Sequence, residues 1–276
     1  MPPSVAIIMR SKNEMPHVRS ALEMLHRQTF RDYELFAIDS GSTDGSLDVL
    51  RSDCDTGHLI EIPPEDYEPG TVLNDAIART DHEIIVLLNA DAVPRSNTWL
   101  EQLVYPIRNQ AADAAFSRQV ARPDARFIVA YDYERAYAPE KPDDHFFSAS
   151  ACAFKRGLWE RHRFHKDGYA EDAIWATACR MFNARFQLVP ESEVEHSHNY
   201  SMGKLYHKKF RHGSSFAKIH GETSPLGYRL YLCARELVRD LIFACRQRQF
   251  RTIPYNMAYR VTIHAGLHQG LRNGAK

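Results

Sequence analysis

The fold is decided by residues 84–94, which read IIVLLNADAVP. The apolar run 84–88 predicts a fully buried strand of a parallel sheet. The run ends at one carboxylate, Asp91, which lies between two alanines and is soon followed by Pro94. In open α/β sheets, ligands bind just outside the carboxyl ends of the strands, and hard cations prefer carboxylate and phosphate oxygens. Asp91 is therefore placed to hold a divalent cation against a phosphate, or more simply to cap the next turn.

Strands and helices alternate through the first part of the chain. Apolar runs predict strands over 5–9, 33–38 and 59–62 in addition to 84–88. Helical spacing of apolar residues predicts helices over 16–28, 46–51 and 71–79. This alternation predicts an α/β fold with a mostly parallel sheet flanked by helices. Beyond about residue 110 the pattern weakens. There we expect a helix over 172–183, a short strand over 187–190 and a helical region from residue 201 onward.

The composition excludes several classes of protein. Hydrophobic residues make up 44% and charged residues 25%, as in ordinary globular domains. No stretch reaches the ~18 consecutive apolar residues of a membrane span, and the start of the chain lacks the pattern of a signal peptide. The five cysteines are scattered, with no C-x-x-C pair, which favours reduced thiols in a cytosol over disulfides or a zinc site.

Polar clusters follow the predicted strands. They read RSKNE (10–14), DSGSTDG (39–45) and NAD (89–91), and later segments read RQ (118–119), FSA (147–149), YAED (169–172) and HSHNYS (196–201). In type, order and spacing these motifs resemble family 2 glycosyltransferases of the GT-A fold, and the later ones resemble its rhamnosyltransferase-like branch. The resemblance covers about residues 4–215.

The resemblance implies a domain organisation. A GT-A-like catalytic domain is expected over 1–203, with a nucleotide-sugar half to about residue 110 and an acceptor half over 111–203. A basic helical extension is expected over 204–276.

The donor side of the site is expected at the strand ends. Asp39 ends a predicted strand, where its carboxylate can accept a hydrogen bond from a nucleobase or a ribose hydroxyl, as in similar enzymes, or can cap its own turn. By resemblance, the nucleotide-sugar-binding residues also include Arg10, Glu14, Gly70, Asn74, Asn89, Ala90, Asp91 and Arg118.

A metal site is expected at the same edge. Asp91 matches the last acid of the family's Asp-x-Asp motif, but Asn89 stands in place of the first acid. One carboxylate plus diphosphate oxygens can still hold Mg²⁺ or Mn²⁺, because magnesium takes few protein ligands. His196 and His198 point the same way if the chain is extended there. In related enzymes a histidine here completes the metal shell or contacts the diphosphate; a structural role is the alternative.

The resemblance also implies a catalytic base. Asp172 matches the acid that removes the acceptor's proton in similar inverting enzymes, and Glu171 can raise its pKa or orient the acceptor. The alternative is a pair of acids that stabilises a helix N-terminus. Ser148 and Ala149 would form the floor beneath the acceptor sugar, and Trp175 would stack on it.

The expected function is transfer of a hexosyl or deoxyhexosyl group, with inversion, from a nucleotide diphosphate-sugar to an acceptor hydroxyl. UDP or dTDP donors are favoured, and the acceptor would be a saccharide or a lipid-linked sugar in surface polysaccharide or glycolipid assembly. Nucleic acid is not an expected partner. A non-catalytic nucleotide-sugar binding protein is one alternative. A sugar nucleotidyltransferase is another, although residues 10–14 lack its Gly- and Arg-rich loop.

Charge is unevenly distributed although the net charge is zero. Residues 200–276 hold 14 Lys and Arg against 3 Asp and Glu, so the rest of the chain is acidic. We expect a cytoplasmic protein whose basic tail contacts the anionic inner face of a membrane. The alternatives are a basic helical surface that is simply solvated, and packing of the tail's apolar stripe on the catalytic domain or against a second subunit in a homodimer.

Overall fold

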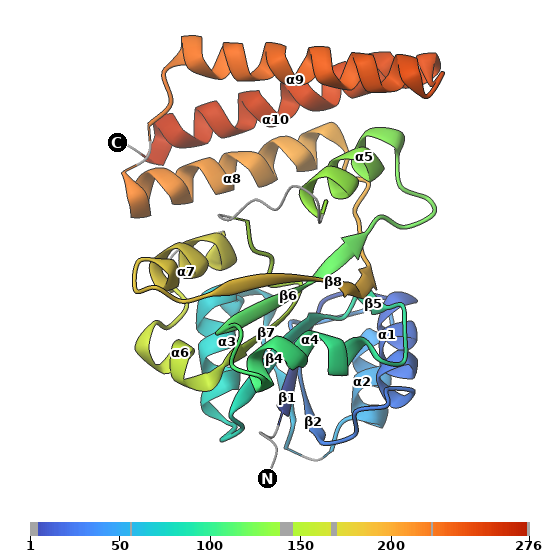
Figure 1. The fold of residues 1–276 in the computed structure, drawn as a ribbon, viewed down its shortest axis with the longest axis vertical. Coiled ribbons are helices and arrows are strands. Elements are labelled where there is room, and N and C mark those ends of the chain that lie inside the picture. The colour runs from blue at the N-terminus through green and yellow to red at the C-terminus, as the bar shows by residue number, and fades with distance from the viewer. Residues whose placement is uncertain (1–4, 56, 139–145, 167–169, 222, 275–276) are drawn as a thin grey trace. The chain divides into compact units, whose positions relative to one another are not determined.

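The computed structural model describes residues 5–55, 57–138, 146–166, 170–221 and 223–274 of the 276 (Figure 1). The chain divides into two compact units. The first comprises Met1–Arg122, Tyr133–Lys166 and Glu171–Ser197, and the second comprises Pro123–Asp132, Asp167–Ala170 and His198–Lys276. The main division therefore falls between Ser197 and His198, a few residues before the boundary that we expected from the sequence.

The first unit is built on an eight-stranded sheet with the order β3-β2-β1-β4-β7-β6-β8-β5. The strands are β1 (Val5–Ser11), β2 (Tyr33–Asp39), β3 (Leu59–Glu61), β4 (Ile84–Asn89), β5 (Val93–Pro94), β6 (Ala114–Val120), β7 (Ala151–Lys155) and β8 (Phe186–Glu195). The predicted parallel half is present, as β3-β2-β1-β4. The sheet as a whole is mixed, because β7 runs antiparallel to both β4 and β6.

Helices cover both faces of the sheet. α1 (His17–His26), α2 (Ser46–Asp53) and α4 (Trp99–Arg108) pack into one apolar cluster with alternate residues of β1 and β4. α3 (Pro69–Ala78), α6 (Arg156–Arg161) and α7 (Glu171–Arg180) pack into a second cluster on the other face; η1 (Pro64–Asp66) precedes α3. Because both faces of β4 are buried, its sequence is apolar without alternation, as predicted.

Strand register brings the polar strand ends together. Arg10 is the register partner of Asn89 across β1 and β4, and Ser11 is that of Asp39 across β1 and β2. The three predicted polar clusters therefore meet at the carboxyl edge of the parallel strands, where α/β folds bind their ligands.

Long helices form most of the second unit. They are α8 (Met202–His220), α9 (Leu226–Arg246) and α10 (Ile253–Gly274), with η2 (Phe250–Thr252) before α10. Gly266, Gly270 and Gly274 recur every fourth residue on α10, and a Cβ on any of them would meet the backbone of α8. These glycines let α8 and α10 pack closely. The helix α5 (Phe127–Ala136) contributes residues to each unit.

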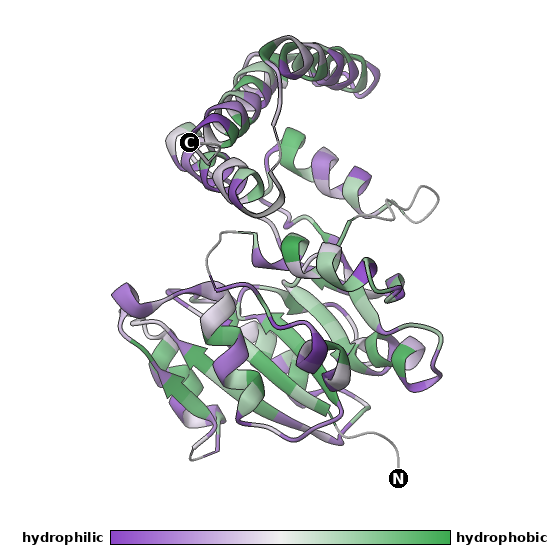
Figure 2. Cartoon of the chain, turned by 90° about the vertical axis from the view of Figure 1, so that its left-hand side faces the viewer, coloured by the Kyte–Doolittle hydropathy of each residue, from purple (hydrophilic) through white to green (hydrophobic). Residues whose placement is uncertain are grey.

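Apolar character is distributed differently in the two units. Hydrophobic residues concentrate in the sheet of the first unit, whereas hydrophobic and hydrophilic positions mix along the helices of the second (Figure 2). Among the described residues, no helix combines the length and the hydrophobicity needed to cross a bilayer.

Candidate active site

Arg10 joins two of the predicted motifs at the edge of the sheet. Its Nε and Nη2 atoms donate to Asn89 Oδ1 at 3.3 and 3.0 Å, and its Nη1 atom donates to Glu171 Oε1 at 2.9 Å. Both partners of the Arg10–Glu171 ion pair are largely shielded from solvent. The Asn89 side-chain oxygen thus accepts from Arg10, and its side-chain NH₂ group makes no hydrogen bond to any residue that the structure describes. Asn89 therefore offers donors, not an acceptor, to a ligand.

Asp172 lies in the first turn of α7, beside Glu171. Its Oδ1 accepts from the Ala173 N–H at 2.8 Å, and its Oδ2 accepts from the Ala149 N–H at 3.4 Å. Burial, together with the negative charge of Glu171, raises the pKa of Asp172 to about 6, against the opposing effect of those N–H groups and of Arg10. A carboxylate with this pKa is half ionised just below neutral pH, which suits a general base.

A second cluster surrounds Asp91, which is buried at the end of β4. Arg122 Nη2 donates to the Asp91 backbone oxygen at 2.6 Å and to its Oδ2 at 3.2 Å. Arg122 also binds Ser197: its Nη1 donates to the Ser197 carbonyl at 2.8 Å, and its N–H donates to Ser197 Oγ at 3.0 Å. Arg122 thus ties the Asp91 loop to the chain that leaves β8. Sequence reasoning missed Arg122, because it follows the quoted Arg118-Gln119 pair without a motif of its own.

His196 follows β8 and faces Asp91, with its Nε2 3.3 Å from Asp91 Oδ2. Its Nδ1 lies 2.7 Å from Gln119 Oε1, and the Gln119 amide donates through Nε2 to Ser148 Oγ at 2.8 Å. Because an amide oxygen only accepts, this network assigns the ring proton to Nδ1 and turns Nε2 toward Asp91.

This arrangement fits a divalent cation. A neutral imidazole would direct the lone pair of Nε2 toward the Asp91 carboxylate, so a proton or a cation must lie between them. Ligand atoms about 2.1 Å from an octahedral ion lie about 3 Å apart, close to the observed separation. Second-sphere carbonyl groups on the far nitrogen commonly orient such histidines, as Gln119 does here. His198, the other histidine expected at the metal, belongs to the second unit, where it begins the segment His198–Lys276.

Ser148 and Ala149 lie between the two clusters. Ser148 receives the hydrogen bond from Gln119, and the Ala149 N–H reaches Asp172. A continuous chain of contacts within the first unit thus runs from Asp91 through His196, Gln119 and the 148–149 segment to Asp172.

Asp39 and Glu14 lie at neighbouring strand ends. Asp39 is buried and accepts hydrogen bonds from the N–H groups of Gly41 and Ser42 and from Ser42 Oγ, which is the turn-capping arrangement. Glu14 is partly buried, and its pKa is raised to about 8 by burial and by the charge of Asp91. Its backbone N–H donates to Ser46 Oγ at 2.9 Å.

Several expected ligand-binding residues have structural contacts instead. Trp175 is buried among Phe147, Phe154, Phe164 and Phe186, and its Nε1 donates to the His162 carbonyl, so its ring faces are not available to stack on a sugar. That expectation is corrected: the i, i+3 spacing from Asp172 places Trp175 on the inner face of α7.

Asn74 is also a packing residue. Its Oδ1 accepts from Trp159 Nε1 and from the Phe164 N–H, and its Nδ2 donates to the Phe164 carbonyl. All of these bonds are buried, so the side chain holds residues 159–164 against α3 rather than pointing at a ligand. Gly70 fits the same interface, since a Cβ there would strike the His165 carbonyl.

The two remaining donor-side residues make ordinary contacts. Ala90 is fully buried, and its N–H donates to the Arg10 carbonyl at 2.9 Å. Arg118 forms an ion pair with Glu193 at 3.3 Å and is about one third exposed.

Comparison with known proteins places this arrangement in a family. The sequence pattern described as "Glycosyl transferase family 2" matches residues 6–163, more than half of the chain, and the chain belongs to this family. Over 115 residues, 40% of the chain, the sequence is 29% identical to Glycosyltransferase AglE of Haloferax volcanii. That match spans only 38% of the relative's own length.

Solved structures share the GT-A-like fold. The mannosyltransferase PcManGT from Pyrobaculum calidifontis, solved with GDP-Man and Mn²⁺, has a TM-score of 0.66 and 22% identity over 99% of this chain and 87% of its own. Glucosyl-3-phosphoglycerate synthase from Mycobacterium tuberculosis, solved with Mn²⁺, UDP and phosphoglyceric acid, has a TM-score of 0.59 and 18% identity over 80% of each chain. TarS 1–349 of S. aureus with UDP has a TM-score of 0.56 and 14% identity over 98% of this chain and 90% of its own.

Proposed function

We propose that this protein is an inverting glycosyltransferase that moves a hexosyl or deoxyhexosyl group from a nucleotide diphosphate-sugar to an acceptor hydroxyl. The observation that carries the proposal is Asp172, a partly buried carboxylate whose pKa is raised to about 6 at the edge of the sheet that also holds the buried Asp91. A sugar hydroxyl is a poor nucleophile, so a base that takes its proton during attack lowers the barrier.

The donor would lie along the strand ends. Asn89 would donate from its amide to ribose or phosphate oxygens, because Arg10 already occupies its carbonyl. Glu14 would line the same crevice, and Asp39 would reach the base or ribose after its turn adjusts. We favour UDP or dTDP as the nucleotide; the solved relatives named above bind UDP or GDP-Man.

Asp91 and His196 would hold Mg²⁺ or Mn²⁺, with His198 as a third ligand two residues further along the chain. When bound, the ion would supply neutralisation of the charge that grows on the departing diphosphate. The mannosyltransferase and the glucosyl-3-phosphoglycerate synthase were both solved with Mn²⁺.

Ser148 and Ala149 would form the floor of the acceptor site. They lie between the proposed metal ligands and the base, since Ser148 accepts from Gln119 and the Ala149 N–H donates to Asp172. Glu171, held by Arg10, would stand beside Asp172, where its negative charge raises the pKa of that base. We place the reaction in surface polysaccharide or glycolipid assembly, in the rhamnosyltransferase-like branch, with a saccharide or lipid-linked acceptor.

The replacement Asp172→Asn tests the proposal. Turnover of an NDP-sugar should fall by several orders of magnitude, while the affinity for the nucleotide and Mn²⁺ stays within about twofold of the wild type. An Asp172→Asn protein that transfers sugar at the wild-type rate would contradict the assignment of the base.

A non-catalytic nucleotide-sugar binding protein is the second candidate. It is favoured by the Arg122–Asp91 ion pair, which places a protein cation against the only acid of the NAD motif. This candidate predicts nucleotide binding without release of free nucleotide from any NDP-sugar, with or without acceptors.

A further inference from the structure

The helix α9 presents an apolar face to solvent. Tyr231, Val238 and Ile242 are 60%, 57% and 46% exposed, and Leu230 and Leu241 are comparably exposed beside them. Their spacing of three, four and seven residues places them on one side of the helix. Single exposed apolar residues are ordinary, but a contiguous row of this kind marks an interaction surface.

The opposite side of α9 is firmly held within the second unit. Asp240 is buried and accepts from Arg239 and Arg260 at 2.7 Å each. Phe243 stacks on Tyr131, with ring centroids 3.7 Å apart. Because these contacts fix the rotation of the helix, the apolar row stays on its outer face.

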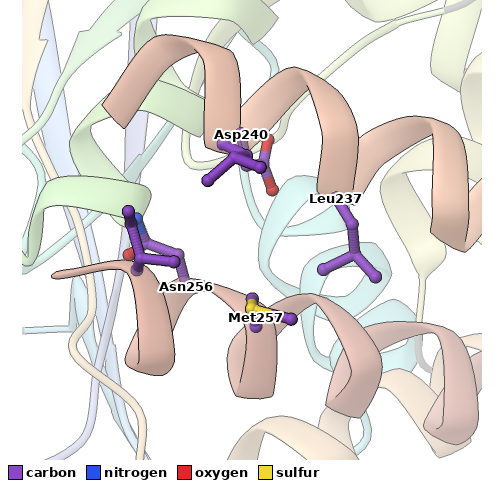
Figure 3. A pocket seen from close by; sticks show the side chains of 6 residues that line it. Leu237, Asp240, Asn256 and Met257 are labelled. Atoms are coloured by element: carbon purple, nitrogen blue, oxygen red, sulfur yellow. The ribbon is translucent and has the colours of Figure 1, made fainter. Parts of the chain in front are cut away.

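The apolar surface continues onto α10. Leu237 and Leu241 of α9 and Met257 of α10 line a small groove between the two helices (Figure 3). Met257 and Val261, one turn apart on α10, are each 51% exposed. The surface therefore spans two helices.

The charged residues around this apolar surface indicate which kind of partner it binds. Arg235, Arg246, Arg248 and Arg251 are exposed on α9 and between α9 and α10. The acidic residues of α9, Glu236 and Asp240, are already in ion pairs with Arg260. A second copy of the same surface would bring these arginines together, whereas an anionic lipid surface would neutralise them.

We propose that α9, with the adjoining face of α10, lies in the interface of an anionic lipid bilayer, with its apolar row among the acyl chains and its arginines at the headgroups. A helix with an apolar face flanked by arginines binds membranes in this way. The contact goes beyond the sugar-transfer reaction and does not depend on it.

Vesicle co-sedimentation of the full chain tests the contact. We expect binding to phosphatidylcholine vesicles that contain 30% phosphatidylglycerol, little binding to pure phosphatidylcholine, and weaker binding at 500 mM than at 50 mM salt. The double variant Arg235→Gln/Arg246→Gln should lower the partition coefficient roughly 25-fold, at about fivefold for each arginine. The triple variant Val238→Ser/Leu241→Ser/Ile242→Ser should abolish measurable binding.

A matched control comes from the first unit. Met181 and Phe182 are 77% and 69% exposed after α7, so Met181→Ser/Phe182→Ser removes exposed apolar area without touching α9. This control should bind vesicles like the wild type. All these substitutions are at exposed positions, and unchanged helicity by circular dichroism would establish that they fold.

Three results would overturn the proposal: no binding to anionic vesicles at low salt, equal binding of the triple variant and the wild type, or a dimer in sedimentation velocity that the triple variant dissociates. The last result would assign the surface to a second copy of the chain. Nucleotide binding by the triple variant separates this test from that of the proposed function, because the donor residues all lie in the first unit.

Discussion

Asp172 sets the pH dependence that we expect of the reaction. Because the base must be ionised, kcat/KM should rise from acid pH to a plateau with a midpoint near the pKa of about 6. A pH series of initial rates between 4.5 and 8.5 measures this. A midpoint near 4, the value of an ordinary exposed Asp, would show that burial and Glu171 do not act on this carboxylate.

The same shift affects stability. The folded pKa of Asp172 lies above the reference value of 3.8, so its contribution to stability is fully present below about pH 4 and is lost as pH rises through about 6. Asp172→Asn should therefore be more stable than the wild type at pH 8 and about equal to it at pH 4. Urea unfolding at both pH values measures the difference. The reverse order at pH 8 would contradict the assigned direction.

Gln119 is a positioning residue for His196. Gln119→Leu removes the acceptor that holds the ring proton on Nδ1, and loss of such an outer partner typically weakens metal binding about 10- to 100-fold. Gln119→Glu keeps an acceptor and should retain the affinity. Calorimetric titration of Mn²⁺ in the presence of UDP measures both. Equal Mn²⁺ affinity for the Leu variant and the wild type would show that His196 does not bind the ion.

Asn74 connects α3 to the segment 159–164. Asn74→Ala leaves the buried donors of Trp159 and Phe164 without their acceptor, at a cost of about 3 kcal/mol in the free energy of unfolding. The neighbouring Asp75→Ala, at an exposed position, is the control and should change stability by less than about 0.5 kcal/mol. Nucleotide affinity should not change in either. If Asn74→Ala were as stable as the wild type but bound nucleotide more weakly, Asn74 would have to be a donor-binding residue and not a packing residue.

The element scale also shows what the sequence can predict. The apolar runs of β1, β2 and β4 predict both their strands and the meeting of Arg10, Asp39 and Asn89, because parallel strands in register align their carboxyl ends. The strands β6 (114–120) and β7 (151–155) can be recognised only from their pairing with strands that are distant in the sequence. The sequence of β6 alone does not indicate a strand, because Ser, Arg and Gln are mixed with its apolar residues. No local feature of the sequence indicates that β7 runs antiparallel to its neighbours.

Individual side chains limit the prediction of the site. Asp172, Asp91 and Gln119 lie in motifs that resemble a family, whereas Arg122 does not. The contacts of Arg122 with Asp91 and of Gln119 with His196 join residues more than 30 positions apart, which the sequence does not indicate. Trp175 shows the opposite error: an aromatic residue one turn from a base suits either a sugar or a core, and only its neighbours in space decide. At Asn89, where the family's motif has an acid, the side-chain oxygen accepts from Arg10, a contact that an aspartate could also make.

At the scale of the whole molecule, the basic charge of the C-terminal region is not all at the surface. Arg260 is buried and pairs with Asp132, Glu236 and Asp240. Arg260→Met leaves those carboxylates without their main partner and should destabilise the second unit by about 3–5 kcal/mol. The exposed Arg235→Met is the control and should be nearly neutral. Hydrogen exchange of α9 and α10 amides measures the effect, and unchanged protection in Arg260→Met would contradict it.

The central claim, a site for a nucleoside diphosphate and a divalent cation at the strand ends, is tested most directly by thermal unfolding. UDP, dTDP, GDP and CMP are each added with and without Mn²⁺, to the wild type and to Asp91→Asn. A ligand at ~100 times its dissociation constant adds about 2.7 kcal/mol of stability. We predict an Mn²⁺-dependent rise of the unfolding midpoint with UDP or dTDP that Asp91→Asn abolishes. No rise with any nucleotide, in the presence or absence of Mn²⁺, would contradict the site.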